Sequence, residues 1–414
     1  MRIKKALFSS GITGFFFDDQ RAVKQGFRHD GFTYEGEPVT TGFSKIRQAG
    51  ESISIMLVLE NDDVAFGDAA AVQYSGAGGR DPLFLAATYL PFLNDKIAPL
   101  IEGEELDSFK RLAEWIDILE FDGKRMHTAI RYGLSQVFLD AVARADRKQK
   151  TEILCNEYNL PLILEPIPLF GQTGDNRYEG VDKMIIKHVD VLPHGLINNI
   201  PDKLGVDGGK LREYIDWLAG RIRRLRVDSR YCPDIHIDVY GNIGEIFGNN
   251  TDRVADYVAS LEKHAMEFKL YIEGPVDVEA KEPQIEALCK IKNRLTSLGS
   301  GVEIVADEWC NTFEDIKDFT DAECCHMVQI KTPDLGSIHN IVESILYCKS
   351  HGMQSYQGGT CNETDISART CAHVALSVRP DRMLAKPGMG FDEGYMIVQN
   401  EMKRTLTLLK NRTN

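Results

Sequence analysis

IHIDVYG at residues 235–241, KLYIEGP at 269–275, EIVADEW at 303–309 and MVQIKTP at 327–333 are four short apolar runs that each end at a charged side chain. These side chains are Asp238, Glu273, Asp307 and Lys331, and 35, 34 and 24 residues separate them along the chain. The spacing is near the roughly 30 residues that one strand and one helix occupy in a (β/α)₈ barrel. Catalytic groups of such barrels gather at the carboxyl ends of the strands. The four runs therefore predict three acids and one amine around a common mouth.

Strands and helices alternate through the rest of the chain from residue 161. The alternation predicts an α/β fold with eight strands, most simply a closed parallel barrel, although an open doubly wound sheet also alternates in this way. No glycine-rich nucleotide fingerprint follows any strand. The predicted strands are ILEPIPLF (163–170), MIIKHVDVL (184–192), DIHIDVYG (234–241), KLYIEG (269–274), EIVADE (303–308), MVQIK (327–331), MQSYQGG (353–359) and RMLAKPG (382–388).

Residues 1–160 differ from this pattern and predict a separate α+β capping domain, so that the barrel domain spans residues 161–414. Apolar runs at 3–17, 52–60 and 64–73 predict an antiparallel meander, and i, i+3, i+4 periodicity predicts helices within 82–101, 105–119 and 127–148. The glycine-bearing segment 14–38 has weak periodicity, and we interpret it as a loop that could move over a site.

Composition narrows the function classes. A formal charge of −14 argues against a nucleic-acid partner. The basic run RIRRLRVDSR (221–230) has helical periodicity and no interleaved aromatics, which favours a solvated or ion-paired helix face. Nine cysteines without a C-x-x-C pair indicate free thiols. The apolar N-terminus reads as a first strand rather than a signal peptide, and no run is long enough for a bilayer, so we expect a soluble, cytoplasmic protein.

The three acids predict a metal site, because carboxylates are rarely buried unless they are paired or bound to metal. Oxygen ligands favour Mg²⁺ or Mn²⁺ over zinc. Near such a cation Lys331 would be held as a neutral amine and could act as a base; the alternative is an ion pair with one of the acids. His194 follows the second predicted strand and could reach the mouth from the opposite side, or be structural. Cys361 has no nearby histidine, so its backbone amide is a better anion donor than its thiol is a nucleophile.

Longer motifs resemble the methylaspartate ammonia-lyase family of the enolase superfamily. They are EPIPLFGQTGDNRYEGVDKMI (165–185), DVLPHGLINN (190–199), IHIDVYG, YIEGP, VADEW, QIKTPDLG (329–336) and SYQGGTCNETD (355–365). The resemblance implies Asp238, Glu273 and Asp307 as Mg²⁺ ligands. It implies Lys331 as the base for the C3 proton of L-threo-3-methylaspartate, and His194 as the group on the opposite face, which stabilises the intermediate and serves the erythro isomer.

The resemblance also implies how a small amino-acid substrate is held. Gln172, Thr360 and Cys361 would bind the carboxylate at C2, Gln329 would support the metal-bound carboxylate, and Gln73 would lie near the amino group. Phe170, Tyr356 and Leu384 would form an apolar wall around the methyl group. The implied reaction is α,β-elimination of ammonia through an enolate to give mesaconate in glutamate fermentation, by a potassium-stimulated homodimer. Two alternatives remain: another enolase-superfamily dehydratase, racemase or cycloisomerase acting on a carboxylate, and a metal-stabilised binding protein without catalysis.

Overall fold

Eight parallel strands close into a barrel in the order β10-β11-β12-β13-β14-β15-β8-β9, which confirms the predicted fold. The structure is a computed structural model that describes residues 1–26, 28–77 and 79–413. The barrel strands are β8 (Leu169–Phe170), β9 (Val191–His194), β10 (Asp234–Asp238), β11 (Leu270–Glu273), β12 (Glu303–Ala306), β13 (Met327–Ile330), β14 (Gln354–Gln357) and β15 (Arg382–Leu384).

Two predicted strands are shorter than their apolar runs. Of the run 184–192, the first three residues end helix α7 (Arg177–Ile186), and the strand begins only at Val191. Met184 and Ile185 are buried on one helix face, so the run combines helical and strand positions that hydrophobicity alone does not separate. Of the run 163–170, only Leu169–Phe170 pairs as a strand. Pro166 and Pro168 precede this pair and offer no backbone N–H for a ladder.

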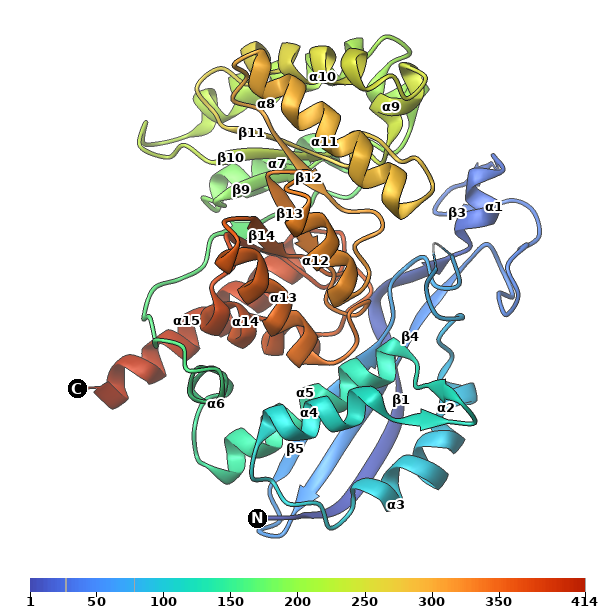
Figure 1. Cartoon of the computed structure of the whole chain (residues 1–414), viewed down its shortest axis with the longest axis vertical. Coiled ribbons are helices and arrows are strands. Elements are labelled where there is room, and N and C mark those ends of the chain that lie inside the picture. Colours follow the sequence, from blue (N-terminus) through green and yellow to red (C-terminus); the bar gives the residue numbers. More distant parts are fainter. Residues whose placement is uncertain (27, 78, 414) are drawn as a thin grey trace.

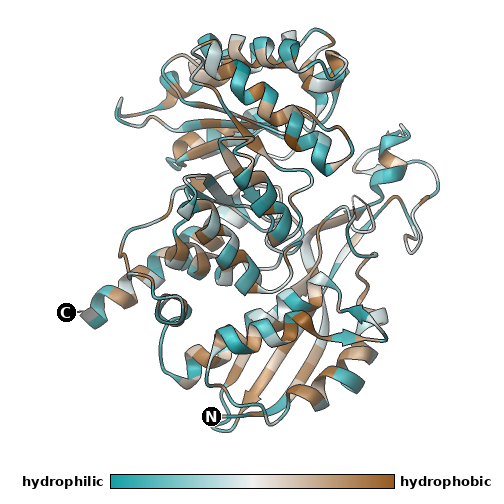
Figure 2. Ribbon diagram, in the orientation of Figure 1, coloured by the Kyte–Doolittle hydropathy of each residue, from teal (hydrophilic) through white to brown (hydrophobic). Residues whose placement is uncertain are grey.

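Helices surround the barrel and bury one apolar face each against it (Figures 1 and 2). In α8 (Gly209–Leu225) this face includes Leu211, Ile215, Leu218 and Ile222. The basic residues of the same helix form ion pairs with neighbouring elements, Arg221 with Asp182 and Arg223 with Glu267, as predicted. The remaining barrel helices are α9 (Asn242–Ile246), α10 (Thr251–Ser260), α11 (Lys281–Ser297), α12 (Phe313–Asp321), α13 (Ile338–Ser350), α14 (Asp365–Val378) and α15 (Asp392–Thr413), with the short π-helix η2 (Ile200–Leu204) and 3₁₀ helix η3 (Glu262–His264).

The cap contains the predicted antiparallel meander, in the order β1-β4-β5. Its strands are β1 (Ile3–Asp18), β4 (Arg47–Leu59) and β5 (Val64–Ala70). Helix α5 (Thr128–Ala145) crosses the sheet so closely that a Cβ on Gly67 would lie 2.5 Å from the carbonyl oxygen of Gly133. The other cap elements are α2 (Ala86–Phe92), η1 (Leu93–Ile97), α3 (Ala98–Ile101), α4 (Phe109–Ile118), β6 (Glu120–Phe121), β7 (Lys124–Arg125) and α6 (Lys150–Glu157).

The segment 14–38 is more regular than a loop. Its first residues complete β1, and α1 (Gln20–Lys24), β2 (His29–Asp30) and β3 (Thr33–Tyr34) follow; residue 27 lies outside the described residues. Figure 1 shows α1 and β3 projecting from the end of the cap sheet. The base of this projection is fixed by Arg47, whose guanidinium forms two 2.7 Å hydrogen bonds to Asp18. Asp18 in turn accepts a hydrogen bond from Gln73, which lines the site described below.

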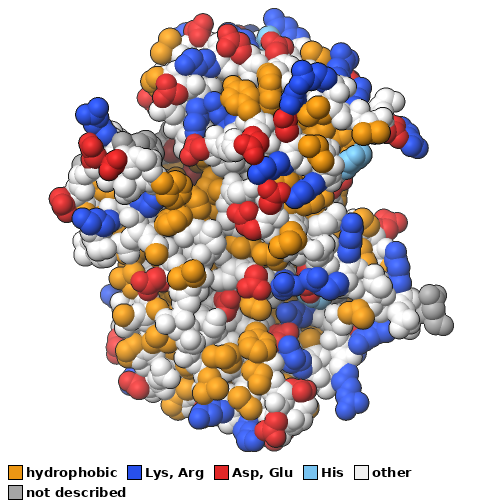
Figure 3. Space-filling model, turned by 180° about the vertical axis from the view of Figure 1, so that it is seen from behind, with side chains coloured by type: hydrophobic (Ala, Val, Ile, Leu, Met, Phe, Trp, Pro, Cys, Tyr) orange, Lys and Arg blue, Asp and Glu red, His pale blue; other side chains and the backbone are white. Residues whose placement is uncertain are grey.

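The surface mixes charges of both signs. Figure 3 shows Lys and Arg interspersed with Asp and Glu over the face seen from behind. Among the described residues, no helix combines the length and apolarity that a membrane crossing requires. All nine cysteines are free thiols, as predicted.

Candidate metal and substrate site

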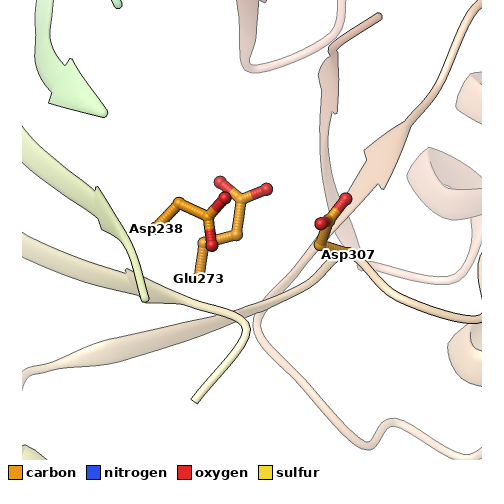
Figure 4. A group of neighbouring side chains, drawn as sticks. All are labelled: Asp238, Glu273 and Asp307. Atoms are coloured by element: carbon orange, nitrogen blue, oxygen red, sulfur yellow. The ribbon is translucent and has the colours of Figure 1, made fainter. Parts of the chain in front are cut away.

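Three carboxylates meet at the barrel mouth because they end neighbouring strands. Asp238 ends β10, Glu273 ends β11 and Asp307 directly follows β12. One oxygen of each lies within 4.8 Å of the others, and Figure 4 shows the three side chains converging. Only 3%, 0% and 9% of these residues are exposed. The sequence prediction of a common acidic cluster is thus confirmed in space.

The electrostatics of the cluster indicate that it is built for a cation. Burial, together with the charge of neighbouring carboxylates, raises the pKa of Asp238 and of Glu273 well above the ordinary range. Glu273 Oε2 is buried, and no group of the described residues donates a hydrogen bond to it. His236 Nε2 lies 2.8 Å from this oxygen but is not aligned for a hydrogen bond. Three carboxylate oxygens are ligands that suit Mg²⁺ better than a metal that prefers nitrogen or sulfur ligands.

The neighbouring acid Glu308 lies outside this cluster. Its carboxylate is 3.8 Å from Lys331 and 3.8 Å from Arg80. The ammonium of Lys331 lowers the pKa of Glu308 against the effect of burial, and Arg80 adds to this effect. Asp307 and Glu308 are adjacent at the end of one strand, and the geometry assigns Asp307 to the cluster.

Lys331 and His194 approach the cluster from opposite sides of the barrel. Lys331 follows β13 and His194 ends β9, four strands away around the ring of eight. Both side chains line one cavity of about 110 Å³ with Asp238 and Asp307. His194 has a φ of 66°, a conformation that costs energy in a non-glycine residue and is concentrated at functional sites.

The protonation of the two groups differs. Burial lowers the pKa of His194 to about 4, so its imidazole is neutral near pH 7. Lys331 Nζ lies 2.9 Å from Asp307 Oδ1 and 3.0 Å from the Asp307 carbonyl oxygen. Burial alone would lower the pKa of Lys331, but the charges of Asp307 and Glu308 outweigh it and raise the pKa. In this structure Lys331 forms an ion pair with Asp307, which was the alternative to a neutral amine in the sequence analysis.

Six of the residues implied for substrate binding line the same cavity: Gln73, Gln172, Gln329, Thr360, Cys361 and Leu384. Phe170 and Tyr356 instead lie inside the barrel beneath it. The ring of Phe170 stacks on His236 at a centroid distance of 4.3 Å, and the Tyr356 hydroxyl donates a 2.5 Å hydrogen bond to Glu273. In this position Tyr356 orients an acid of the cluster.

Two glutamines, Gln73 of the cap and Gln172 after barrel strand β8, present oxygen atoms to the cavity. Gln172 Nε2 donates to the carbonyl oxygens of Ala385 and Gly388, at 3.2 and 2.8 Å, which uses both of its amide hydrogens. Gln73 Nε2 donates to Asp18 at 2.6 Å, and Gln73 Oε1 accepts a hydrogen bond from the Cys361 thiol at 3.4 Å. Each side chain therefore offers a carbonyl oxygen, a group that binds a donor such as ammonium.

Sequence reasoning missed Arg80, Tyr74, Tyr240 and Met389, which also line the cavity. Arg80 comes from the cap and forms a 2.9 Å ion pair with Asp334, which follows β13. The glycine-rich stretch before Arg80 was the available signal, since it marks a loop. A larger cavity of about 770 Å³ lies elsewhere, between α2, the β6–β7 hairpin and α5, and Arg80 lines that cavity too.

Comparisons with known proteins agree with this geometry. Family models for the N-terminus and the C-terminus of methylaspartate ammonia-lyase match residues 1–159 and 161–411. The methylaspartate ammonia-lyase of Citrobacter amalonaticus is 63% identical over 412 residues, which cover 100% of both chains. Its crystal structure containing (2S,3S)-3-methylaspartic acid has a TM-score of 0.98 and covers 99% of this chain and 100% of that one. The Mg complex of β-methylaspartase from Clostridium tetanomorphum is 53% identical, with a TM-score of 0.96 and full coverage of both chains.

More distant structures share the fold alone. The L-Ala-D/L-Glu epimerase of Bacillus subtilis is 14% identical, with a TM-score of 0.65 over 96% of this chain and 91% of that one. The capped parallel barrel with an acidic cluster at its mouth defines the class of the molecule, a (β/α)₈-barrel protein with a candidate metal site. Within that class, the family models and the full-length identity show that the chain belongs to the methylaspartate ammonia-lyase family. It is therefore a carbon–nitrogen lyase.

Proposed function

We propose that this enzyme eliminates ammonia from L-threo-3-methylaspartate to give mesaconate, with Mg²⁺ as its cofactor. The observation that carries the proposal is one small cavity lined by two of the three clustered acids, a lysine and a histidine on opposite strands, and two glutamine oxygens. The Citrobacter relative crystallised with the methylated amino acid and the Clostridium relative crystallised as a Mg complex support the choice of substrate and metal.

Asp238, Glu273 and Asp307 would hold the cation, with Tyr356 orienting Glu273 through its hydroxyl. A bound Mg²⁺ supplies Lewis-acid stabilisation of the negative charge that develops on the substrate carboxylate next to C3, a contribution of several kcal/mol. Gln329 lines the same cavity, and within the described part of the chain its buried Oε1 has no hydrogen-bond donor.

Lys331 takes the C3 proton in this proposal. When Asp307 is a metal ligand, its negative charge is compensated and no longer favours the ammonium form of Lys331, so a neutral amine becomes accessible. A base placed in this way contributes about 10²–10⁴-fold to the rate. His194 faces the substrate from the opposite side as a neutral imidazole, able to stabilise the intermediate or to take the proton from the erythro isomer.

The amino group lies between the oxygens of Gln73 and Gln172. The resemblance implied a carboxylate contact for Gln172, but both of its amide hydrogens already bind backbone carbonyls, so we assign its oxygen to the ammonium. Thr360 and the Cys361 backbone then receive the carboxylate at C2. Leu384 supplies apolar surface for the methyl group.

The test is incubation of purified protein with Mg²⁺ and 3-methylaspartate while ultraviolet absorbance reports an unsaturated diacid. Rising absorbance is expected, and chelation of the metal should abolish it. A flat trace together with turnover of a hydroxy acid or another carboxylate would favour a different reaction of the superfamily. Exchange of the C3 hydrogen with solvent deuterium separates catalysis from binding alone, because a binding protein leaves C3 unlabelled.

We further propose, from the family, that the enzyme is a cytoplasmic homodimer activated by potassium and acts in glutamate fermentation. Membership of the family supports these points. Light scattering of the purified protein tests the dimer. Replacing potassium with sodium at constant ionic strength tests the activation, since an unspecific salt effect would give equal rates.

A further inference from the structure

A fully buried ion pair lies beneath the substrate side of the cavity. Lys386 and Glu363 are both 0% exposed, and Lys386 Nζ is 2.7 Å from Glu363 Oε1. Lys386 also donates to Thr332 Oγ1 and to the Gly358 carbonyl oxygen, each at 2.7 Å. The second carboxylate oxygen of Glu363 accepts a 2.9 Å hydrogen bond from Tyr132 of the cap helix α5. None of these residues lines the cavity, yet such a pair costs desolvation energy and is weak evidence for stability as such.

The pair directly contacts the segment that carries Thr360 and Cys361. A Cβ added to Gly359, whose φ is 140°, would lie within 3.0 Å of Glu363 Oε1, Lys386 Nζ and Thr332 Oγ1. The backbone of this segment therefore rests on the ion pair with no space for a side chain. Its position depends on where the two charged groups lie.

The same pair fixes the segment that holds Gln172. Lys386 lies between Ala385 and Gly388, the two residues whose carbonyl oxygens bind the Gln172 amide. Gly388 also donates a 2.8 Å backbone hydrogen bond to the Cys361 carbonyl oxygen, so the two segments are joined directly. One buried charge pair thus connects both groups of residues that the proposed function places on the amino and carboxylate ends of the substrate.

We propose that Lys386 and Glu363 are positioning residues for substrate recognition: they hold segments 358–361 and 385–388 in the geometry that presents Thr360, Cys361 and Gln172. This inference rests on the proposed function. It predicts that loosening the pair weakens substrate binding while the metal site, on β10 to β12, is unaffected.

The test uses Thr332→Val, which keeps the side-chain shape and removes one hydroxyl from the pair. The matched control is Thr151→Val, since Thr151 is 1% exposed and its hydroxyl also makes a buried hydrogen bond, to His373. Thr332→Val removes two hydrogen bonds, the one that the hydroxyl accepts from Lys386 and the one that it donates to Glu363. We expect it to raise KM for 3-methylaspartate and the Kd for mesaconate at least about fivefold. The Mg²⁺ affinity should stay within about twofold, and Thr332→Ser should restore binding. Lys386→Met should exceed the Thr332→Val effect.

A second readout needs no substrate. Amide hydrogen exchange at 358–361 and 385–388 should be at least about tenfold faster in Thr332→Val than in Thr151→Val, because local opening becomes easier. Unchanged exchange there, or equal losses of Mg²⁺ and mesaconate affinity in both threonine variants, would overturn the positioning role. Faster local exchange in an enzyme whose wild type ignores 3-methylaspartate would instead overturn the proposed substrate.

Discussion

Replacing Asp238 with Asn should stabilise the metal-free enzyme while it weakens the response to Mg²⁺. Asp238 is 3% exposed, and its ligand oxygen lies within 4.8 Å of those of Glu273 and Asp307. Two unit charges at this distance repel by about 3 kcal/mol at an effective dielectric constant of about 20. Proton uptake by the acids and the ammonium of Lys331 relieve part of this repulsion. We therefore expect a net gain of about 1–3 kcal/mol in the unfolding free energy of the variant in EDTA.

Magnesium should oppose the higher stability of Asp238→Asn, because it stabilises mainly the wild type. At a free concentration of 100 times Kd, a ligand that binds only the folded state contributes about 2.7 kcal/mol. Loss of one of three carboxylate ligands should reduce this increment by at least about 1.4 kcal/mol, which corresponds to a tenfold weaker Kd at the same concentration.

Urea unfolding at about pH 8, with EDTA and with Mg²⁺, measures both quantities. Asp95→Asn is the matched control, because it removes one negative charge from an exposed position of the cap. It should change neither the stability in EDTA nor the Mg²⁺ increment. If Asp238→Asn is less stable than the wild type in EDTA, or gains as much from Mg²⁺, the carboxylates do not form a repulsive metal site and the reasoning fails.

Three further variants test other parts of the molecule. Lys331→Ala should lower kcat at least about 10²-fold, and near-normal turnover would remove Lys331 from the role of base. Tyr356→Phe removes the hydroxyl that orients Glu273 and should weaken Mg²⁺ binding about 10–100-fold by calorimetry; an unchanged Kd would show that this hydrogen bond does not matter. Burial alone would raise the pKa of Glu401, but hydrogen bonds from His373 and two arginines lower it overall. Glu401→Gln should therefore destabilise the protein by about 1–3 kcal/mol near pH 7. A lowered folded pKa gives stability that is lost on protonation, so this difference should shrink as the pH falls towards about 3; an equal difference at both pH values in urea unfolding would contradict the assignment.

The barrel and its acidic cluster were predictable because both follow from local patterns. Each acid directly ends an apolar run, and parallel strands bring their carboxyl ends together whatever the details of the helices. The limits of β9 were not predictable in this way, because the apolar residues within 184–192 lie partly at the end of a helix and partly in a strand.

Features that depend on contacts between distant segments could not be predicted from the sequence. Arg80 reaches the cavity only because the cap places it against Asp334, 254 residues further along the chain. The ion pair between Lys331 and Asp307 depends on how the side chains at the ends of two neighbouring strands are placed, which the spacing of the residues does not specify. The orientation of the Gln172 amide is set by two carbonyls more than 200 residues away.

The division of the cavity between the two parts of the chain has an evolutionary consequence. Strands β10, β11 and β12 carry the three acids of the candidate metal site, whereas Gln73 and Arg80 reach the cavity from the cap. Gln73 is connected to the projecting segment through Asp18 and Arg47. In the mechanism that we propose, mutations in the cap can therefore change which amine leaves, or adds in the reverse direction, without disturbing the metal site that acidifies C3. A laboratory search for new amination catalysts should begin there.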